Sequence, residues 1–108
     1  MTASNLPLKI AELSDIFIPP EGGKKLFILC DGIQEEDVAV RFSWKCPNQS
    51  WDVTVHPTHV HESCALVLTS PPYSGGALDY AREVFVRIFR PSDRKSSSSQ
   101  LMYFVPKC

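Results

Sequence analysis

The chain lacks both an excess of charge of either sign and a long hydrophobic run. It carries 11 Lys and Arg against 12 Asp and Glu, a formal net charge of −1 over 108 residues. This balance leaves no general positive field to hold nucleic acid or an anionic membrane. No apolar stretch approaches the roughly 20 residues of a membrane span, and the first residues lack the parts of a signal peptide. We therefore expect no membrane role, and reduced thiols at Cys30, Cys46, Cys64 and Cys108.

The sequence also has little capacity for helix. Nine prolines and five glycines are spread along the chain, and no window of about fifteen residues free of them has helical apolar spacing. Segments rich in β-branched, aromatic and other apolar residues alternate with turn residues. They span residues 6–13, 24–30, 38–44, 51–55, 64–69, 83–89 and 101–105. The sequence predicts one all-β domain over residues 1–108, an immunoglobulin-like β-sandwich of about seven strands, with residues 1–5 and 107–108 flexible.

Two of the expected strands are apolar on both faces. Segment 38–44 alternates apolar and polar residues, which is typical of a sheet with one solvated face. In segment 24–30, by contrast, the face of Leu26 and Ile28 is opposed by Phe27 and Leu29, and segment 64–69 has the same character. If one face fills the core, the other face exposes apolar area to water. This exposure costs about 25 cal/mol of free energy per Å². The pattern predicts that something covers this face, unless a loop or the crowded middle of the sandwich already does.

Residues that could carry chemistry gather in one segment. The densest group of metal-ligand residues comprises His56, His59, His61 and Cys64, with Cys46 upstream. On a strand His59 and His61 would share a face, but Pro57 interrupts the run and the spacing matches no standard zinc finger. A cysteine within an apolar strand, such as Cys30, usually acts as a small hydrophobe. We expect no metal site, no cofactor and no catalytic residue. A metal- or cysteine-dependent enzyme remains as an alternative, ranked third after the two interpretations given below.

Motifs in a fixed order carry a resemblance that covers residues 8 to about 106. They are Leu8-Lys9-Ile10, Gly22-Gly23, Leu26-Phe27-Ile28-Leu29-Cys30-Asp31, Ile33-Gln34, Asp37-Val38, Val40-Arg41-Phe42, Trp51, Val60-His61, Ala65-Leu66-Val67, Pro71-Pro72-Tyr73 and Arg90-Pro91-Ser92-Asp93. Together they resemble the dimerization domain of the Rel/NF-kappaB transcription factors, an immunoglobulin-like domain also called IPT or TIG. The resemblance implies a non-enzymatic module that pairs two DNA-binding subunits through one sheet face.

The resemblance also implies which residues form that interface. Carried over position by position, they are Glu12, Ser14, Phe27, Leu29, His61, Cys64, Ala65 and Val67. This face is the one left over once Leu26 and Ile28 are assigned to the core, because residues at i and i+2 of a strand share a face. The implied partners are a second copy or a related Rel subunit, and an ankyrin-repeat inhibitor. The implied localisation is both cytoplasmic and nuclear.

For DNA, the resemblance implies a role only in an intact protein. The family's separate amino-terminal domain makes nearly all base contacts, so we expect this chain to be a fragment in which Gly32 and Gln34 at most touch the phosphate backbone. The chain departs from the family at Glu12, Glu62 and Cys64, where basic or larger residues are common, and at Gly32, where lysine is common. The runner-up interpretation is an immunoglobulin-like interdomain packing module of another multidomain protein, without a DNA role.

Overall fold

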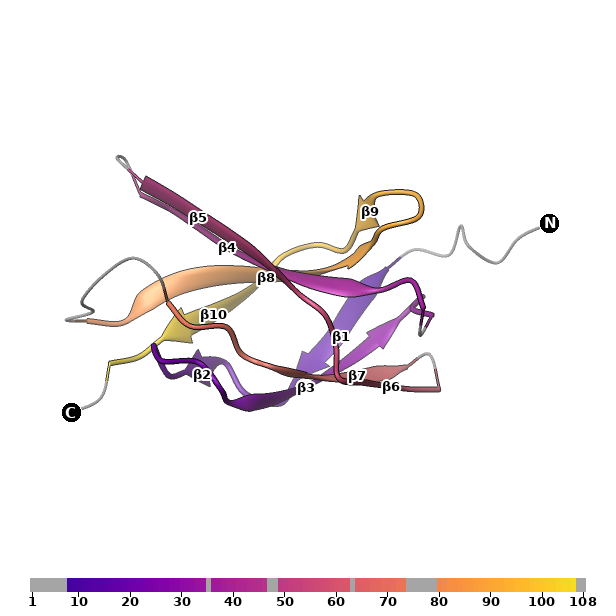
Figure 1. The fold of residues 1–108 in the computed structure, drawn as a ribbon, viewed down its shortest axis with the longest axis horizontal. Helices are drawn as coiled ribbons and strands as arrows, with labels where there is room; N and C mark the ends of the chain where they lie inside the picture. Colours follow the sequence, from indigo (N-terminus) through magenta and orange to yellow (C-terminus); the bar gives the residue numbers. More distant parts are fainter. Residues whose placement is uncertain (1–7, 35, 47–48, 63, 74–79, 107–108) are drawn as a thin grey trace.

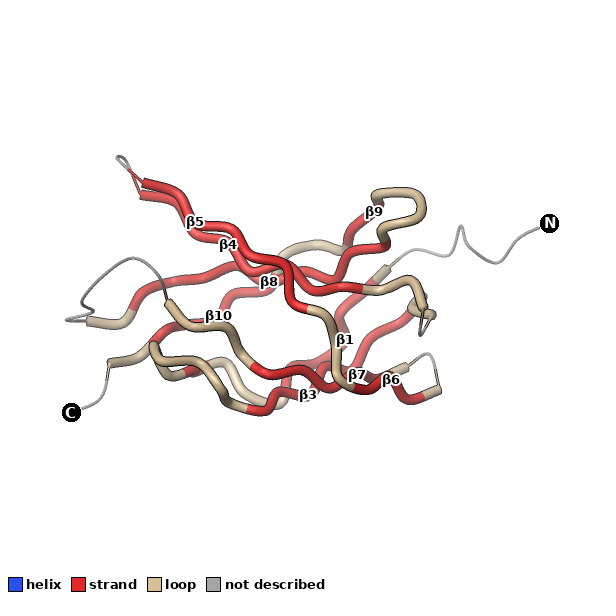
Figure 2. Tube along the Cα trace, in the orientation of Figure 1, coloured by secondary structure: helices blue, strands red, loops and turns tan. Residues whose placement is uncertain are grey.

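A computed structural model describes residues 8–34, 36–46, 49–62, 64–73 and 80–106. These residues contain ten strands and no helix (Figure 2). Within the same ranges there is accordingly no helix long and apolar enough to cross a membrane. The termini that the sequence predicts to be flexible, residues 1–5 and 107–108, lie outside the described residues.

The strands form two sheets that pack against each other as a sandwich (Figure 1). The first sheet has the order β1-β3-β7-β6, with all neighbours antiparallel: β1 (Lys9–Leu13), β3 (Lys25–Asp31), β7 (Ala65–Thr69) and β6 (His59–His61). The second has the order β2-β10-β8-β4-β5: β2 (Phe17–Ile18), β10 (Gln100–Phe104), β8 (Arg82–Arg90), β4 (Ala39–Cys46) and β5 (Gln49–Val55). The short β9 (Lys95–Ser96) pairs with β8.

The predicted fold class is confirmed, with more strands than expected. Each of the seven expected segments overlaps a strand, namely β1, β3, β4, β5, β7, β8 and β10. The three further strands, β2, β6 and β9, are only two or three residues long. Such lengths are too short for an alternating pattern to be recognised in a sequence.

The core lies between the sheets and is filled by alternate residues of the long strands. On β4 the side chains of Val40, Phe42 and Trp44 are buried, as the alternation of that segment predicts. The opposing sheet contributes fully buried residues from β3 and β7, and β8 and β10 complete the centre: Leu26, Ile28, Leu66, Leu68, Val84, Val86, Ile88, Met102 and Phe104. Burial of each large side chain contributes about 1.5–3 kcal/mol. The inner face of each strand is therefore fixed.

The turn before β3 lies tightly against the segment that follows β7. Gly22 N donates to Pro19 O at 3.1 Å, and Gly23 N donates to Ser70 O at 2.9 Å. Both glycines have positive φ, +79° and +86°. A Cβ on Gly22 would lie 2.7 Å from the backbone nitrogen of Pro72, whereas one on Gly23 would meet nothing within 4 Å. At position 22 both the positive φ and the close approach of the Pro72 backbone require glycine, whereas at position 23 only the positive φ does.

The Arg90-Pro91-Ser92-Asp93 motif ties the β8–β9 connection to the loop before β4. Ser92 N donates to Asp37 Oδ1 at 3.0 Å, and the Ser92 hydroxyl donates to Asp37 Oδ2. Arg90 is only 3% exposed, and its Nε lies 3.5 Å from Asp93 Oδ1. Such contacts between buried or partly buried charges demand good geometry, because desolvation is costly. The Arg90-Pro91-Ser92-Asp93 motif therefore has a structural role, because its contacts hold the β8–β9 connection in place.

We expect Gly22→Ala to destabilise the fold more than Gly23→Ala. An alanine at either site adopts a left-handed conformation at a cost of about 1–2 kcal/mol. Gly22→Ala also places a methyl group against the backbone of Pro72. We therefore expect Gly22→Ala to lower the free energy of unfolding by at least about 1 kcal/mol more than Gly23→Ala does. Urea denaturation of both variants measures this difference, and equal losses would contradict the close approach.

We expect the Cys30 thiol to resist alkylation. Burial is the main cause that raises its pKa to about 11, and charge repulsion from the nearby Asp31 and Cys64 contributes to the same rise. A raised pKa leaves about one thiol in a thousand as thiolate at pH 8, and only the thiolate reacts. Treatment with iodoacetamide at pH 8, followed by peptide mapping, measures the labelling. Cys64 is exposed and serves as the internal control; equal labelling rates would show that Cys30 is accessible.

Candidate functional site

The outer face of the β1-β3-β7-β6 sheet carries large hydrophobic side chains in contact with solvent. On β3, Leu26, Ile28 and Cys30 are buried, while Phe27 and Leu29 are 50% and 48% exposed. The described part of the chain thus leaves about half of each side chain uncovered. No loop within these residues fulfils the covering role that the sequence pattern calls for, so the patch is open to a partner.

The strand register arranges the expected interface residues in two rows across this face. In one row Phe27 pairs with Val67, which pairs with His59. In the other, Leu29 lies between Glu12 and Ala65, and Ala65 pairs with His61. Directly opposed residues of antiparallel strands share a face. We call these seven residues together with Ser14 the outer face: Glu12, Ser14, Phe27, Leu29, His59, His61, Ala65 and Val67.

Ser14 lies next to Phe27 of the first row and forms two hydrogen bonds with its backbone. Its N donates to Phe27 O at 2.9 Å, and its hydroxyl accepts from Phe27 N at 3.0 Å. Together with Glu12, Leu13, Phe27 and Leu29 it lines a shallow hollow of about 230 Å³. These contacts fix the position of β1 against β3. The hollow gives the face a contour that a complementary surface can fill.

Cys64 is exposed and lies just before β7, next to Ala65 in the chain. Its carbonyl accepts from Cys30 N at 2.8 Å, which extends the β3–β7 pairing by one residue. Its thiol donates to His61 O at 3.6 Å. The structure therefore places seven of the eight sequence-predicted interface residues on one face, whereas Cys64 lies opposite Cys30, whose side chain is buried.

His59 belongs to this face although the resemblance did not include it among the interface residues. It occupies the row of Phe27 and Val67. The signal was present in the sequence, because His59 and His61 are two residues apart on an extended segment. The missing information was that this segment forms β6 and pairs with β7.

Gly32 and Gln34 lie outside the two rows. They belong to the connection between β3 and β4, where Gly32 has a φ of +84° and Gln34 is exposed. The Gln34 carbonyl accepts from Asp37 N at 3.0 Å. This turn leaves the Gln34 side chain open to solvent at one end of the sheet.

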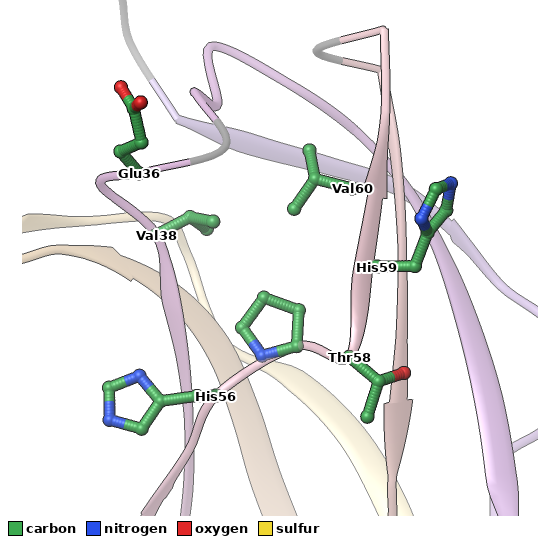
Figure 3. A pocket seen from close by; sticks show the side chains of 7 residues that line it. Glu36, Val38, His56, Thr58, His59 and Val60 are labelled. Atoms are coloured by element: carbon green, nitrogen blue, oxygen red, sulfur yellow. The ribbon is translucent and has the colours of Figure 1, made fainter.

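The histidine-rich segment does not converge on a common point. A hollow of about 260 Å³ is lined by Glu36, Val38, His56, Pro57, Thr58, His59 and Val60. Figure 3 shows the rings of His56 and His59 directed away from each other, on opposite sides of this hollow. Among the described residues no group of three or more His, Cys, Asp or Glu side chains is arranged to hold a metal ion.

The arginines of the second sheet contact the chain itself. Arg41 donates through Nη2 to both carboxylate oxygens of Asp52 at 2.9 Å, and its guanidinium lies 5.7 Å from the ring centre of Phe89. Arg82 lies over Trp44 and Tyr80 at 5.1 and 5.3 Å. Such cation–π contacts contribute about 0.5–1 kcal/mol at exposed sites. These cations stabilise the β4–β5–β8 surface.

Comparison of the sequence with known proteins shows to which family the chain belongs. The sequence matches the model of the Rel homology dimerisation domain over residues 9–108. It is 31% identical over 106 residues to the nuclear factor NF-kappa-B p100 subunit of Gallus gallus, covering 96% of this chain and 11% of that protein. It is 33% identical over 88 residues to the transcription factor p65 of Gallus gallus, covering 80% of this chain and 15% of that protein.

A solved structure shares the fold. The TIG domain of human nuclear factor of activated T-cells, cytoplasmic 4, superimposes with a TM-score of 0.77 at 21% identity, covering 93% of this chain and 89% of that one. The family match spans nearly the whole chain, and the relatives named above are transcription factor subunits and not enzymes. The chain therefore belongs to the Rel homology dimerisation domain family.

Proposed function

We propose that this dimerisation domain pairs two Rel-type subunits through the outer face of the β1-β3-β7-β6 sheet. The observation that carries the proposal is the half exposure of Phe27 and Leu29 on a central strand. A two-fold pairing buries the same patch on both subunits at once. Removing this apolar area from water supplies the driving force, at about 25 cal/mol per Å².

The distribution of polarity on the outer face supports the same role. The two central strands contribute the apolar residues Phe27, Leu29, Ala65 and Val67, and the flanking strand segments contribute Glu12, Ser14, His59 and His61. Stable protein interfaces commonly combine an apolar centre with a polar rim that remains partly solvated. The centre supplies affinity, and the rim influences which partner is preferred.

Pairing joins two subunits of a longer transcription factor, in which a separate domain reads the DNA bases. The exposed Gln34 and the turn at Gly32 then contact the phosphate backbone and support position rather than sequence reading. An ankyrin-repeat inhibitor is the further partner, and the intact protein moves between cytoplasm and nucleus. The support for these last two roles is the resemblance to NF-kappa-B subunits.

The fragment is expected to form a dimer that Phe27→Ala and Leu29→Ala each weaken. Central apolar anchors usually contribute more than about 1 kcal/mol to association, which corresponds to at least a fivefold rise in the dissociation constant. Sedimentation equilibrium of the parent and of both variants measures these dissociation constants.

Phe85→Ala is the matched control for these variants. Phe85 is an aromatic residue on the second sheet with 43% exposure, so its truncation leaves the association constant unchanged. A stably folded parent that remains monomeric at high micromolar concentration would refute homodimerisation and favour interdomain packing. Equal effects of the Phe85 and Phe27 variants would refute the choice of face.

The isolated chain is expected to bind duplex DNA weakly and without sequence preference. Its net charge is −1, and phosphate contacts through basic residues supply most non-specific affinity. Mobility-shift assays at physiological salt, with a kappaB-type duplex and a scrambled duplex of equal length, compare the two affinities. Selective retardation of one duplex would place base reading in this domain.

A further inference from the structure

The edge strand β6 presents two histidines on the same side. His59 and His61 flank Val60, which packs against the core, so both rings lie on the opposite, outer face. The two ring centres are 6.4 Å apart, and the ring planes are inclined by 34°. β6 is the last strand of its sheet, and both histidines are exposed. Each ring can therefore turn about its side-chain bonds without displacing a core residue.

We propose that His59 and His61 together bind a divalent transition-metal ion such as Ni²⁺ or Zn²⁺. Neutral imidazole nitrogen is a preferred ligand for these ions. Zinc–nitrogen bonds are about 2.0–2.1 Å long, so two nitrogens on one tetrahedral ion lie about 3.3 Å apart. Residues i and i+2 of a strand lie about 6–7 Å apart on one face, so binding requires a rotation of the two exposed rings that brings one nitrogen of each to that separation.

The charge beside the pair favours a cation. Glu62 Oε2 lies 3.4 Å from His61 Nε2, and both side chains are largely exposed. A carboxylate next to a ligating histidine orients the ring and increases its basicity. Glu62 thus supports the ion as this second partner of His61.

The site is a two-histidine site and not a closed structural one. Across the described ranges no cluster of three or more potential ligands is arranged for a metal, so water completes the coordination. His56 is excluded because its ring points away from His59 across the hollow lined by Pro57 (Figure 3). The Cys64 thiol contacts the His61 carbonyl instead of the ring nitrogens.

Calorimetric titration of the tag-free, reduced chain with NiCl₂ tests the proposal. We expect one ion per chain, with His59→Asn and His61→Asn each raising the dissociation constant by at least about tenfold, because loss of one imidazole removes the chelate. His56→Asn is the matched control, and Cys64→Ser tests the thiol; both stay within about twofold of the parent. Unfolding midpoints verify that the exposed substitutions leave the fold intact.

Both ligands come from one chain and belong to the polar rim of the outer face, so the site needs no residue of a partner subunit. The Phe27→Ala variant therefore retains Ni²⁺ binding even where it weakens pairing, which separates the two proposals. Absence of Ni²⁺ binding by the parent at millimolar metal would overturn the proposal. So would a parent-like affinity in His59→Asn or His61→Asn, or an equal loss in His56→Asn.

Discussion

The alternation of β3 is the constraint on which the rest of the structure depends. Successive side chains of a strand point to opposite faces, so burial of Leu26, Ile28 and Cys30 directs Phe27 and Leu29 outward. A strand with apolar residues at five consecutive positions, Leu26 to Cys30, cannot bury both of its faces within one two-layer sandwich. The fold of a single chain is thus complete at its core and leaves apolar area on its outer face, and we propose that pairing with a second subunit covers this area.

The other distinctive residues of the chain hold this sheet in place. Gly22 allows the turn before β3 to approach Pro72 closely, which fixes β3 relative to the end of β7. Ser92 hydrogen-bonds Asp37 and so ties the second sheet to the loop that leaves β3. Both contacts join segments that are distant in the sequence and so help to position the sheet, and a preorganised surface binds at a lower entropic cost.

The sequence predicted the sandwich and its core because strand periodicity is a local property. The same periodicity separated Phe27 and Leu29 from the core, and the family resemblance then supplied the other residues that we expect at the interface. Sequence reasoning left His59 out of the face because strand pairing between β6 and β7 is a long-range property, and a three-residue strand carries no recognisable pattern. The contacts of Arg41 with Phe89 and of Arg82 with Trp44 could not be predicted from the sequence either, since they join residues distant in sequence.

An isotope-filtered nuclear Overhauser experiment on the dimer tests the central claim most directly. One copy is labelled with ¹³C and mixed with an unlabelled copy, so that only contacts between the two chains are detected. The account predicts contacts to the Phe27 ring and to the methyl groups of Leu29 and Val67. Intermolecular contacts confined to Phe85 and its neighbours on the second sheet would contradict it, because a different face would then join the subunits.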